Sequence, residues 1–205
     1  MTTISEVNFR DIYHQICFIA INDNIKHIMN QADFLGAEKA NGILAYTYID
    51  YEAGLTFEIL CWAVCKEDTL SAFDGNNTVS FKLRGSNVED CNIVPLTGIE
   101  CARYQDKIDM VNDVYKCPEG IKFTRGIKDI DSCRNANYPD DILVYLVSEK
   151  NQPEGCWVRC TDAKDNHIRG TLLNEPNQDF GVHCGTVIEF GVMKQGDNNI
   201  CIASL

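Results

Sequence analysis

The fold of this chain is indicated most directly by the stretch GCWVRCTDAKDNHIRGTLL, residues 155–173. Residues 155–161 and 167–173 combine β-branched, aromatic and other apolar side chains, a composition that favours extended backbone. The polar residues 162–166 between them have the composition of a hairpin loop. The stretch therefore predicts two antiparallel strands joined by a short connection.

Short strands are also predicted on both sides of this hairpin. They occupy residues 142–148, 186–193 and 199–203, and a turn at residues 194–198 joins the last two. Short strands separated by turns roughly every 8–12 residues are typical of small barrels and strongly curled sheets. Residues 136–205 are therefore predicted to form a small, five-stranded, barrel-like β module.

The N-terminal part, residues 1–135, has a mixed pattern. Apolar runs predict strands at residues 15–22, 43–50, 56–64 and 78–84, with turns at residues 51–54 and 74–77. Apolar spacing predicts helices at residues 23–35 and 98–116, and short helical turns are expected at residues 68–73 and 127–133. We therefore expect an α+β fold with two domains, 1–135 and 136–205. An N-terminal mixed sheet with two or three helices would pack against the C-terminal module.

Composition indicates a folded protein with reduced cysteines. The chain has 205 residues, of which 45% are hydrophobic and 23% charged, as in ordinary globular proteins. Its longest apolar runs, residues 16–21 and 59–65, are too short to span a bilayer, and no signal-peptide pattern is visible at the N-terminus. The 11 cysteines lie mostly in apolar runs, so we interpret them as buried thiols of a cytoplasmic protein rather than as a disulfide framework.

The net charge of −12 is spread along the chain and bears on the class of partner. No block of basic residues is present to neutralise phosphates, which argues against binding to nucleic acid or to an anionic membrane. A diffuse negative field can steer a basic protein partner, and it can also serve solubility alone. The charge therefore favours a protein partner, in particular a basic one, without requiring it.

Three segments of the C-terminal module form a recognisable pattern. They are GCWVRCT at residues 155–161, GTLLNEP at residues 170–176 and GVHCGTVIEF at residues 181–190. The pattern resembles a group of bacterial domains of unknown function that share W-V-x-V/R, G-x-L-x-N-E/D-P and G-x-x-x-G-D-x-V-x-F. Thr186 stands where that group usually has Asp. The resemblance implies a compact β module of bacterial or phage origin, and some comparable small domains are immunity or interaction modules.

The same segments contain the candidate binding residues. These are the polar or aromatic residues in and near the loop that follows the hairpin, namely Trp157, Asn174, Glu175, Asn177 and Asp179. A structural interpretation competes with binding, because Pro176 suits a turn and Gly181 and Gly185 allow close backbone contact. The sequence leaves both interpretations open.

Metal-binding patterns are weak in this sequence. Cys61 and Cys65, like Cys156 and Cys160, are separated by three residues within predicted strands. At 3.3 Å per residue the members of such a pair lie about 13 Å apart, too far to share one zinc ion. We therefore predict no metal site and no cofactor.

Catalytic patterns are equally weak. His183 and Cys184 are adjacent, and neighbouring side chains on a strand point to opposite faces, so the two would not form a nucleophile–base pair with each other. Phosphate-binding loops, nucleophile elbows and zinc-protease motifs do not occur. The sequence thus favours a non-enzymatic protein-binding module of immunity or regulatory type. The alternative is a small hydrolase or thiol-dependent enzyme centred on Cys184 and His183, and the oligomeric state is not indicated.

Overall fold

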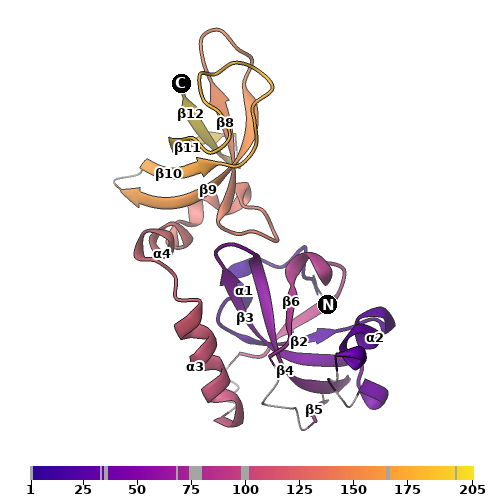
Figure 1. Ribbon diagram of the computed structural model, residues 1–205. Helices are drawn as coiled ribbons and strands as arrows, with labels where there is room; N and C mark the ends of the chain where they lie inside the picture. The colour runs from indigo at the N-terminus through magenta and orange to yellow at the C-terminus, as the bar shows by residue number, and fades with distance from the viewer. Residues whose placement is uncertain are drawn as a thin grey trace. The chain divides into compact units, whose positions relative to one another are not determined.

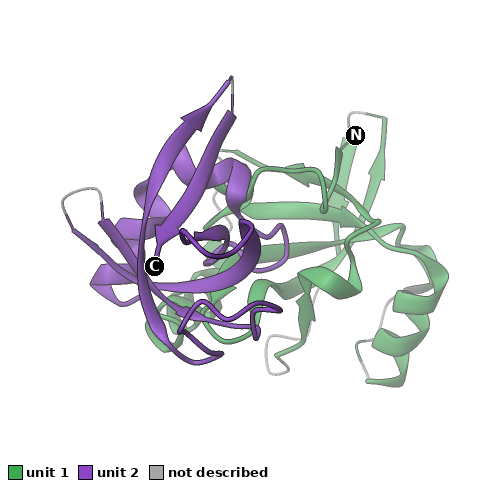
Figure 2. Ribbon diagram, turned by 90° about the horizontal axis from the view of Figure 1, so that it is seen from above, with its two compact units in different colours: residues 1–116 green, residues 117–205 purple. Residues whose placement is uncertain are grey.

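The computed structural model divides into two compact units, residues 1–116 and residues 117–205 (Figure 2). It describes residues 2–32, 34, 37–67, 69–73, 80–97, 102–164, 167–196 and 198–205. Residues 117–135, which the sequence assigned to the N-terminal domain, belong to the C-terminal unit.

The N-terminal unit is built on a seven-stranded sheet. Its strands are β1 (Thr2–Thr3), β2 (Ile16–Ala20), β3 (Gly42–Asp50), β4 (Gly54–Lys66), β5 (Thr69–Ala72), β6 (Lys82–Arg84) and β7 (Asn92–Pro95). The strand order is β1-β7-β2-β3-β4-β5, and β6 also pairs with β4. All described pairs in this sheet are antiparallel. The long β3–β4 hairpin confirms the predicted turn: the Asp50 side chain accepts the N–H groups of Glu52 and Ala53.

Both faces of this sheet are covered, which explains why its central strands are apolar almost without interruption. One core cluster contains Phe57 and Trp62 of β4 and extends to Met29 of the helix α2. A second cluster contains Tyr46 of β3 and Leu60 of β4 together with apolar residues of the helix α3.

The helices of this unit are α1 (Phe9–Ile12), α2 (Asp23–Gln31) and α3 (Gln105–Val114), with 3-10 turns η1 (Ala37–Lys39), η2 (Gly85–Asn87) and η3 (Ala102–Tyr104). α2 begins after Asn22 because the Asn22 side chain caps it by accepting the N–H of Ile25 (2.9 Å). α3 buries Ile108 and Val111 in the second core cluster. Both α2 and α3 lie within the ranges predicted for them.

The C-terminal unit contains a closed five-stranded barrel, as predicted (Figure 1). Its strands are β8 (Asp141–Val147), β9 (Glu154–Lys164), β10 (His167–Leu172), β11 (Val187–Gln195) and β12 (Asn198–Ser204). They are arranged in the order β10-β11-β12-β8-β9, and β12 pairs with β8 in parallel while the other pairs are antiparallel. Alternate residues such as Cys156, Val158 and Cys160 point into the barrel core. The chain is therefore an α+β protein with a small C-terminal barrel.

Two helical segments precede the barrel, α4 (Glu119–Gly126) and η4 (Lys128–Cys133). α4 lies close to β9, and Gly120 makes this approach possible: a Cβ there would be 2.8 Å from the Thr161 carbonyl oxygen. η4 is held against β12, since the Ser132 hydroxyl donates to the Asn199 carbonyl (3.1 Å) and the Asn199 side chain donates to the Asp129 carbonyl (2.9 Å). η4 confirms the predicted helical turn at residues 127–133, whereas α4 was not predicted.

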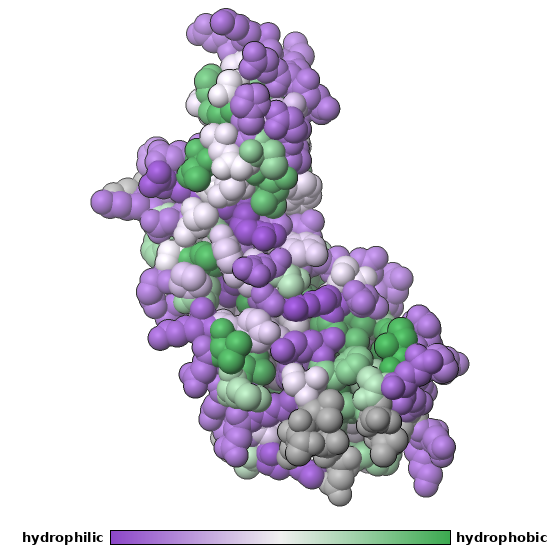
Figure 3. Space-filling view, in the orientation of Figure 1, coloured by the Kyte–Doolittle hydropathy of each residue, from purple (hydrophilic) through white to green (hydrophobic). Residues whose placement is uncertain are grey.

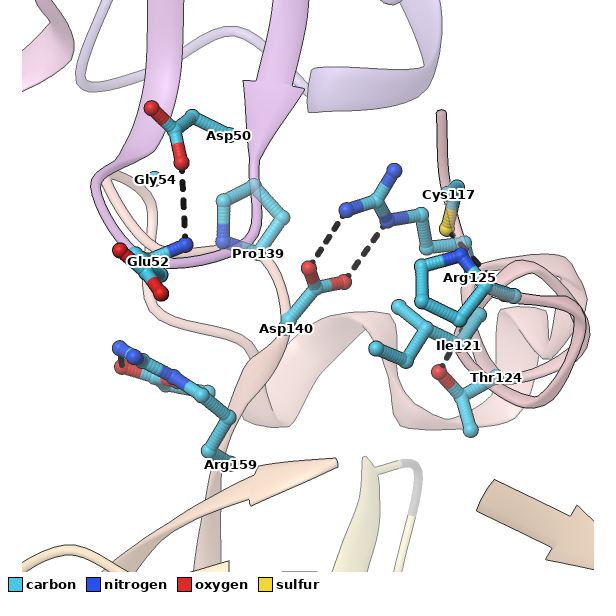
Figure 4. A network of polar contacts seen from close by, with 12 residues as sticks. Asp50, Glu52, Gly54, Cys117, Ile121, Thr124, Arg125, Pro139, Asp140 and Arg159 are labelled. Carbon is cyan, nitrogen blue, oxygen red and sulfur yellow. Dashed lines mark hydrogen bonds and ion pairs between the residues drawn. The ribbon is translucent and has the colours of Figure 1, made fainter. Parts of the chain in front are cut away.

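Arginine side chains connect these helical segments to the barrel. Arg125 of α4 donates to both carboxylate oxygens of Asp140 (2.8 and 2.6 Å), and Figure 4 shows the two groups facing each other. Arg134 donates to backbone carbonyl groups at the end of α4 and just before β8 (2.7 and 2.6 Å). Arg159 of β9 bonds both oxygens of Asp141 on β8 (2.7 and 3.0 Å). The C-terminal unit is thus fixed by bidentate pairs as well as by its apolar core.

Two expectations are changed by the structure. Residues 69–72 form the strand β5 rather than a helical turn, because they pair with residues 63–66 at the end of β4. Of the predicted strand at residues 78–84, residues 82–84 form β6, and the predicted turn at residues 74–77 lies outside the described residues. Within the described ranges, no helix has both the length and the apolar character needed to cross a membrane.

Candidate functional site

The loop between β10 and β11, residues 173–186, contains most of the residues that the sequence singled out. Glu175 braces this loop: one carboxylate oxygen bonds Nδ1 of His183 (2.6 Å), and the other accepts the backbone N–H of Cys184 (2.9 Å). The hydrogen bond with Glu175 raises the pKa of His183, and the bonds from His183 and Cys184 lower the pKa of Glu175. Because the His183 and Glu175 side chains are 74% and 58% exposed, the brace is a surface ion pair.

Cys184 lies in a turn of this loop and is exposed. Its thiol donates to the carbonyl oxygen of Leu173 (3.3 Å). In the described part of the chain, the thiol has no hydrogen bond with the His183 ring, whose Nδ1 is engaged by Glu175. A nucleophile and its general base are expected within hydrogen-bond reach of each other, so this geometry gives the thiol-enzyme hypothesis no support.

The other candidate binding residues hold the loop in place. The side-chain oxygen of Asn174 accepts the backbone N–H of Trp157 (2.8 Å). Asn177 donates its backbone N–H and its side-chain amide to one oxygen of Glu154 (2.6 and 2.7 Å). Asp179 accepts the backbone N–H two residues further along the chain (3.0 Å). These contacts favour the structural interpretation of the loop, because each polar group already has a partner within the unit.

Glu154 completes the brace, and no pattern in the sequence indicates this role. It begins β9 and accepts hydrogen bonds from Asn177 and from the backbone N–H of Gln178 (3.1 Å). The backbone hydrogen bond from Asn177 is the main cause that lowers the pKa of Glu154. A single acidic residue at the start of a strand has no motif around it, so only the folded structure reveals this role.

A groove lined by both apolar and polar side chains lies between the β9–β10 hairpin and the β11–β12 hairpin, next to α4 and η4. Its volume is about 870 Å³, and its lining includes Phe123, Ile127, His167, Ile168, Val192 and Lys194. A neighbouring hollow of about 710 Å³ shares Phe123 and Ile127 with it. Unlike the loop, the groove brings together segments that are far apart in the sequence.

Phe123 lines this groove with 58% of its surface accessible, and Val192 is 37% accessible. Figure 3 shows apolar patches in green on the otherwise hydrophilic surface of the molecule. The groove is also lined by polar side chains, among them Asp129, His167 and Lys194. A hollow that combines accessible apolar side chains with a few polar ones is typical of a binding site.

The sequence did not predict the groove because it did not predict α4. This helix buries Ile121, Thr124 and Arg125, which leaves Phe123 on the opposite side and accessible to solvent. The helical spacing of these buried residues was the available signal. It was weak, since α4 has only eight residues and contains two glycines.

Most cysteines in the described ranges are packed in the two units. Cys17, Cys61, Cys91, Cys133, Cys156, Cys160 and Cys201 are buried free thiols. Burial raises the pKa of Cys160 to about 12 and that of Cys17 to about 11, so these sulfur atoms stay protonated. The described residues contain no group of three or more potential metal ligands.

The N-terminal unit contains a buried ion pair between Glu58 of β4 and Lys107 of α3 (3.1 Å), with side chains 1% and 7% exposed. The Lys107 ammonium also donates to the carbonyl oxygen of Ile59 (2.7 Å), and the Ser80 hydroxyl donates to Glu58 (3.1 Å). The ion pair offsets the cost of burying either charge alone. The pair connects α3 to the sheet, so we assign it a structural role.

Comparisons with protein-family models, with curated proteins and with solved structures give no match. The likeness of residues 155–190 to a bacterial domain group therefore stays a prediction. The geometry of the C-terminal unit is the basis for the functional proposal that follows.

Proposed function

We propose that this chain is a non-enzymatic protein-binding module that holds its partner in the groove of the C-terminal unit. The observation that carries the proposal is the accessible Phe123 side chain beside Ile127, Ile168 and Val192 in a hollow of about 870 Å³. Removing the exposed part of one such side chain from water contributes about 1–2 kcal/mol to binding. Phe123 and Val192 together provide accessible apolar contacts of the kind that protein interfaces commonly have.

The groove supports this proposal better than the loop at residues 173–186 does. The polar groups of Asn174, Glu175 and Asn177 are already bonded within the unit, and a partner would have to displace those bonds. The apolar side chains of the groove, by contrast, have no hydrogen bonds that a partner would have to displace. The loop is therefore proposed as scaffold and the groove as contact surface.

The proposal extends to the class of partner and the compartment. The net charge of −12 favours a basic protein partner. Free thiols are kept in the reducing cytoplasm, which is where we place the protein. The resemblance of residues 155–190 to bacterial domains agrees with an immunity-type or regulatory role.

The test is affinity capture with the full-length chain from a native lysate of the source organism, followed by binding measurements with the purified partner. Three baits are compared with the wild type: Phe123→Ser and Val192→Ser in the groove, and Met193→Ser as the matched control. Met193 neighbours Val192 on β11 but points to the other face of the strand, and it is 48% exposed. Thermal denaturation establishes that each bait is folded.

We expect a protein that the wild type and Met193→Ser capture equally and that the groove variants lose. Calorimetry with the purified partner is expected to show at least tenfold weaker binding for Phe123→Ser, about 1.4 kcal/mol. Captured proteins that bind all four baits with equal affinity would show that the groove is not the contact surface.

A further inference from the structure

Two cysteines of the C-terminal unit meet where η4 packs against β12. Cys133 ends η4, Cys201 lies in β12, and both side chains belong to the core of this unit. The Cys133 thiol donates to the carbonyl oxygen of Asn199 (3.5 Å), two residues before Cys201 on the same strand. The Cys133 sulfur also forms hydrogen bonds with the thiol and with the backbone N–H of Cys201. The two sulfur atoms are therefore in direct contact.

Neighbouring hydrogen bonds hold the two segments together. The Ser132 hydroxyl donates to the Asn199 carbonyl (3.1 Å), and the Asn199 side chain donates to the Asp129 carbonyl (2.9 Å). Cys201 is fixed in its strand, which pairs with β11 on one side and with β8 on the other. A disulfide forms readily only between cysteines that the fold already holds close together. The contact between η4 and β12 meets this requirement.

The surroundings of Cys133 favour its ionised form. The hydrogen bond from the Cys201 thiol lowers the pKa of Cys133 most, and the Ser132 hydroxyl, the Cys201 N–H and the positive charge of Arg134 lower it further, against the effect of burial. Ionisation gives up only the long hydrogen bond to Asn199. The same contact raises the pKa of Cys201, which keeps its proton. The pair thus combines one thiolate with one thiol.

The two cysteines also differ in their access to solvent. Cys133 has 8% of its surface accessible, whereas Cys201 is fully buried. Oxidants react with the thiolate form of cysteine and need access to its sulfur atom. Hydrogen peroxide is little larger than water, so a narrow opening is sufficient for it. Cys133 is therefore the member of the pair that meets a small oxidant.

We propose that Cys133 and Cys201 form a reversible disulfide, which locks η4 onto β12 when the protein meets a hydroperoxide. The Cys133 thiolate attacks one peroxide oxygen, so that an S–O bond forms, the O–O bond breaks and hydroxide leaves. The Cys201 sulfur then displaces the hydroxyl group of this sulfenic acid, which leaves as water with the Cys201 proton. The two sulfur atoms together lose two electrons, and the peroxide is reduced to hydroxide and water. A dithiol reductant restores both thiols.

Disulfide mapping provides the test. The full-length chain with Cys184→Ser, which lacks the exposed thiol of the loop, is treated with hydrogen peroxide at neutral pH. Remaining thiols are blocked with N-ethylmaleimide, and the protein is digested without reduction for mass spectrometry. We expect a peptide pair linked through Cys133 and Cys201 that dithiothreitol separates. Cys133→Ala and Cys201→Ala should lose the linkage, whereas Cys156→Ala, a control in the same barrel core, should retain it.

The proposed lock also has a measurable effect on stability. The disulfide closes a loop of the chain that contains β8 to β11, and such a closure restricts the unfolded chain. Urea unfolding of the C-terminal unit is followed through the fluorescence of Trp157 in a Trp62→Phe background. We expect peroxide to move this transition to higher urea concentration and dithiothreitol to move it back. Cys201→Ala should show no such shift, and thermal denaturation establishes that each variant is folded.

The outcomes are independent of the proposed function, because no partner takes part in the experiment. A linkage between Cys201 and Cys160, whose sulfur lies near enough to influence that of Cys201, would overturn the proposal. Oxidation of Cys133 to sulfinic or sulfonic acid without any linkage would overturn it as well. So would a linkage that forms only in urea. A Cys133–Cys201 disulfide that leaves the unfolding transition unchanged would overturn the lock.

Discussion

At the scale of single residues, Glu175 controls the loop at residues 173–186 through His183 and Cys184. The pKa of His183 is raised from 6.5, so the contribution of its protonated ring to folding stability is complete below that value and is lost as the pH rises through the folded pKa. The pKa of Glu175 is lowered from 4.5, so the contribution of its carboxylate to folding stability is present above that value and is lost as the pH falls through the folded pKa. The ion pair therefore holds the loop mainly under mildly acidic to near-neutral conditions.

Replacement of Glu175 by Gln is predicted to lower the pKa of His183 toward its ordinary value. The amide can still form a hydrogen bond, but it removes the negative charge that stabilises the protonated ring. An NMR titration of the His183 ring protons measures the change. Glu189→Gln is the control, because Glu189 forms an exposed ion pair with Arg169 (3.3 Å) and not with His183. An unchanged His183 pKa in Glu175→Gln would show that the Glu175–His183 pair does not exist in solution.

Cys184 is predicted to be the first cysteine that reacts with iodoacetamide in the folded protein. It is exposed, whereas most other described cysteines are buried. Mass spectrometry of peptides after short labelling identifies the modified site, and Cys184→Ser should remove the early product. A Cys184 rate far above that of an unfolded control peptide would revive the thiol-enzyme hypothesis, whereas an ordinary rate agrees with its exposed position alone.

At the scale of elements, the contact between α4 and β9 depends on Gly120, and Gly126 in the same helix provides a matched control. A Cβ at position 120 would lie 2.8 Å from the Thr161 carbonyl oxygen, whereas a Cβ at position 126 has nothing within 4 Å. We expect Gly120→Ala to lower the free energy of unfolding by about 1–3 kcal/mol. Gly126→Ala should be neutral or stabilising by up to about 1 kcal/mol, since alanine favours helix. Urea denaturation measures both, and equal effects would contradict the packing.

The elements differ in how far local sequence determines them. The β3–β4 hairpin and the barrel strands could be predicted, because their apolar runs and turn residues agree with the final structure. β5 could not be predicted, because residues 69–72 become extended through their pairing with the end of β4. α4 could not be predicted, because Gly120 weakens its local preference for helix. The need for glycine at this position arises from packing against Thr161 of β9, which is distant in the sequence.

At the scale of the whole molecule, each unit has its own core and its own tryptophan. Trp62 is fully buried in the N-terminal unit, and Trp157 lies on β9 of the barrel. The chain contains these two tryptophans only, so single replacement by Phe leaves a fluorescence reporter for either unit. Unfolding of the two units can therefore be followed separately.

Loss of the Arg125–Asp140 pair is predicted to destabilise the C-terminal unit. The two side chains are 5% and 4% exposed, and removal of one partner from a buried pair costs about 3–5 kcal/mol. Asp140→Ala should move the transition that Trp157 reports to lower urea concentration and leave the Trp62 transition in place. Glu119→Gln is the control, because Glu119 and Lys122 are 86% and 70% exposed and their pair contributes little. Equal shifts in both variants would contradict this assignment.

The candidate site shows why function was harder to predict than fold. The residues singled out by the sequence, from Asn174 to Asp179, do meet in one loop, but their polar groups bond within the unit. The groove instead combines Phe123, Ile168 and Val192, which no local pattern relates to one another. Their proximity results from the barrel closure and from the packing of α4, both of which are tertiary.

The most direct test of the central claim is an NMR chemical-shift map of the isotope-labelled full-length chain, titrated with the captured partner. Binding in the groove predicts that the largest shifts occur at Phe123, at Ile127 and along Gly191–Lys194, with small shifts in the loop at residues 173–186. Shifts concentrated in that loop, with the groove unchanged, would contradict the account.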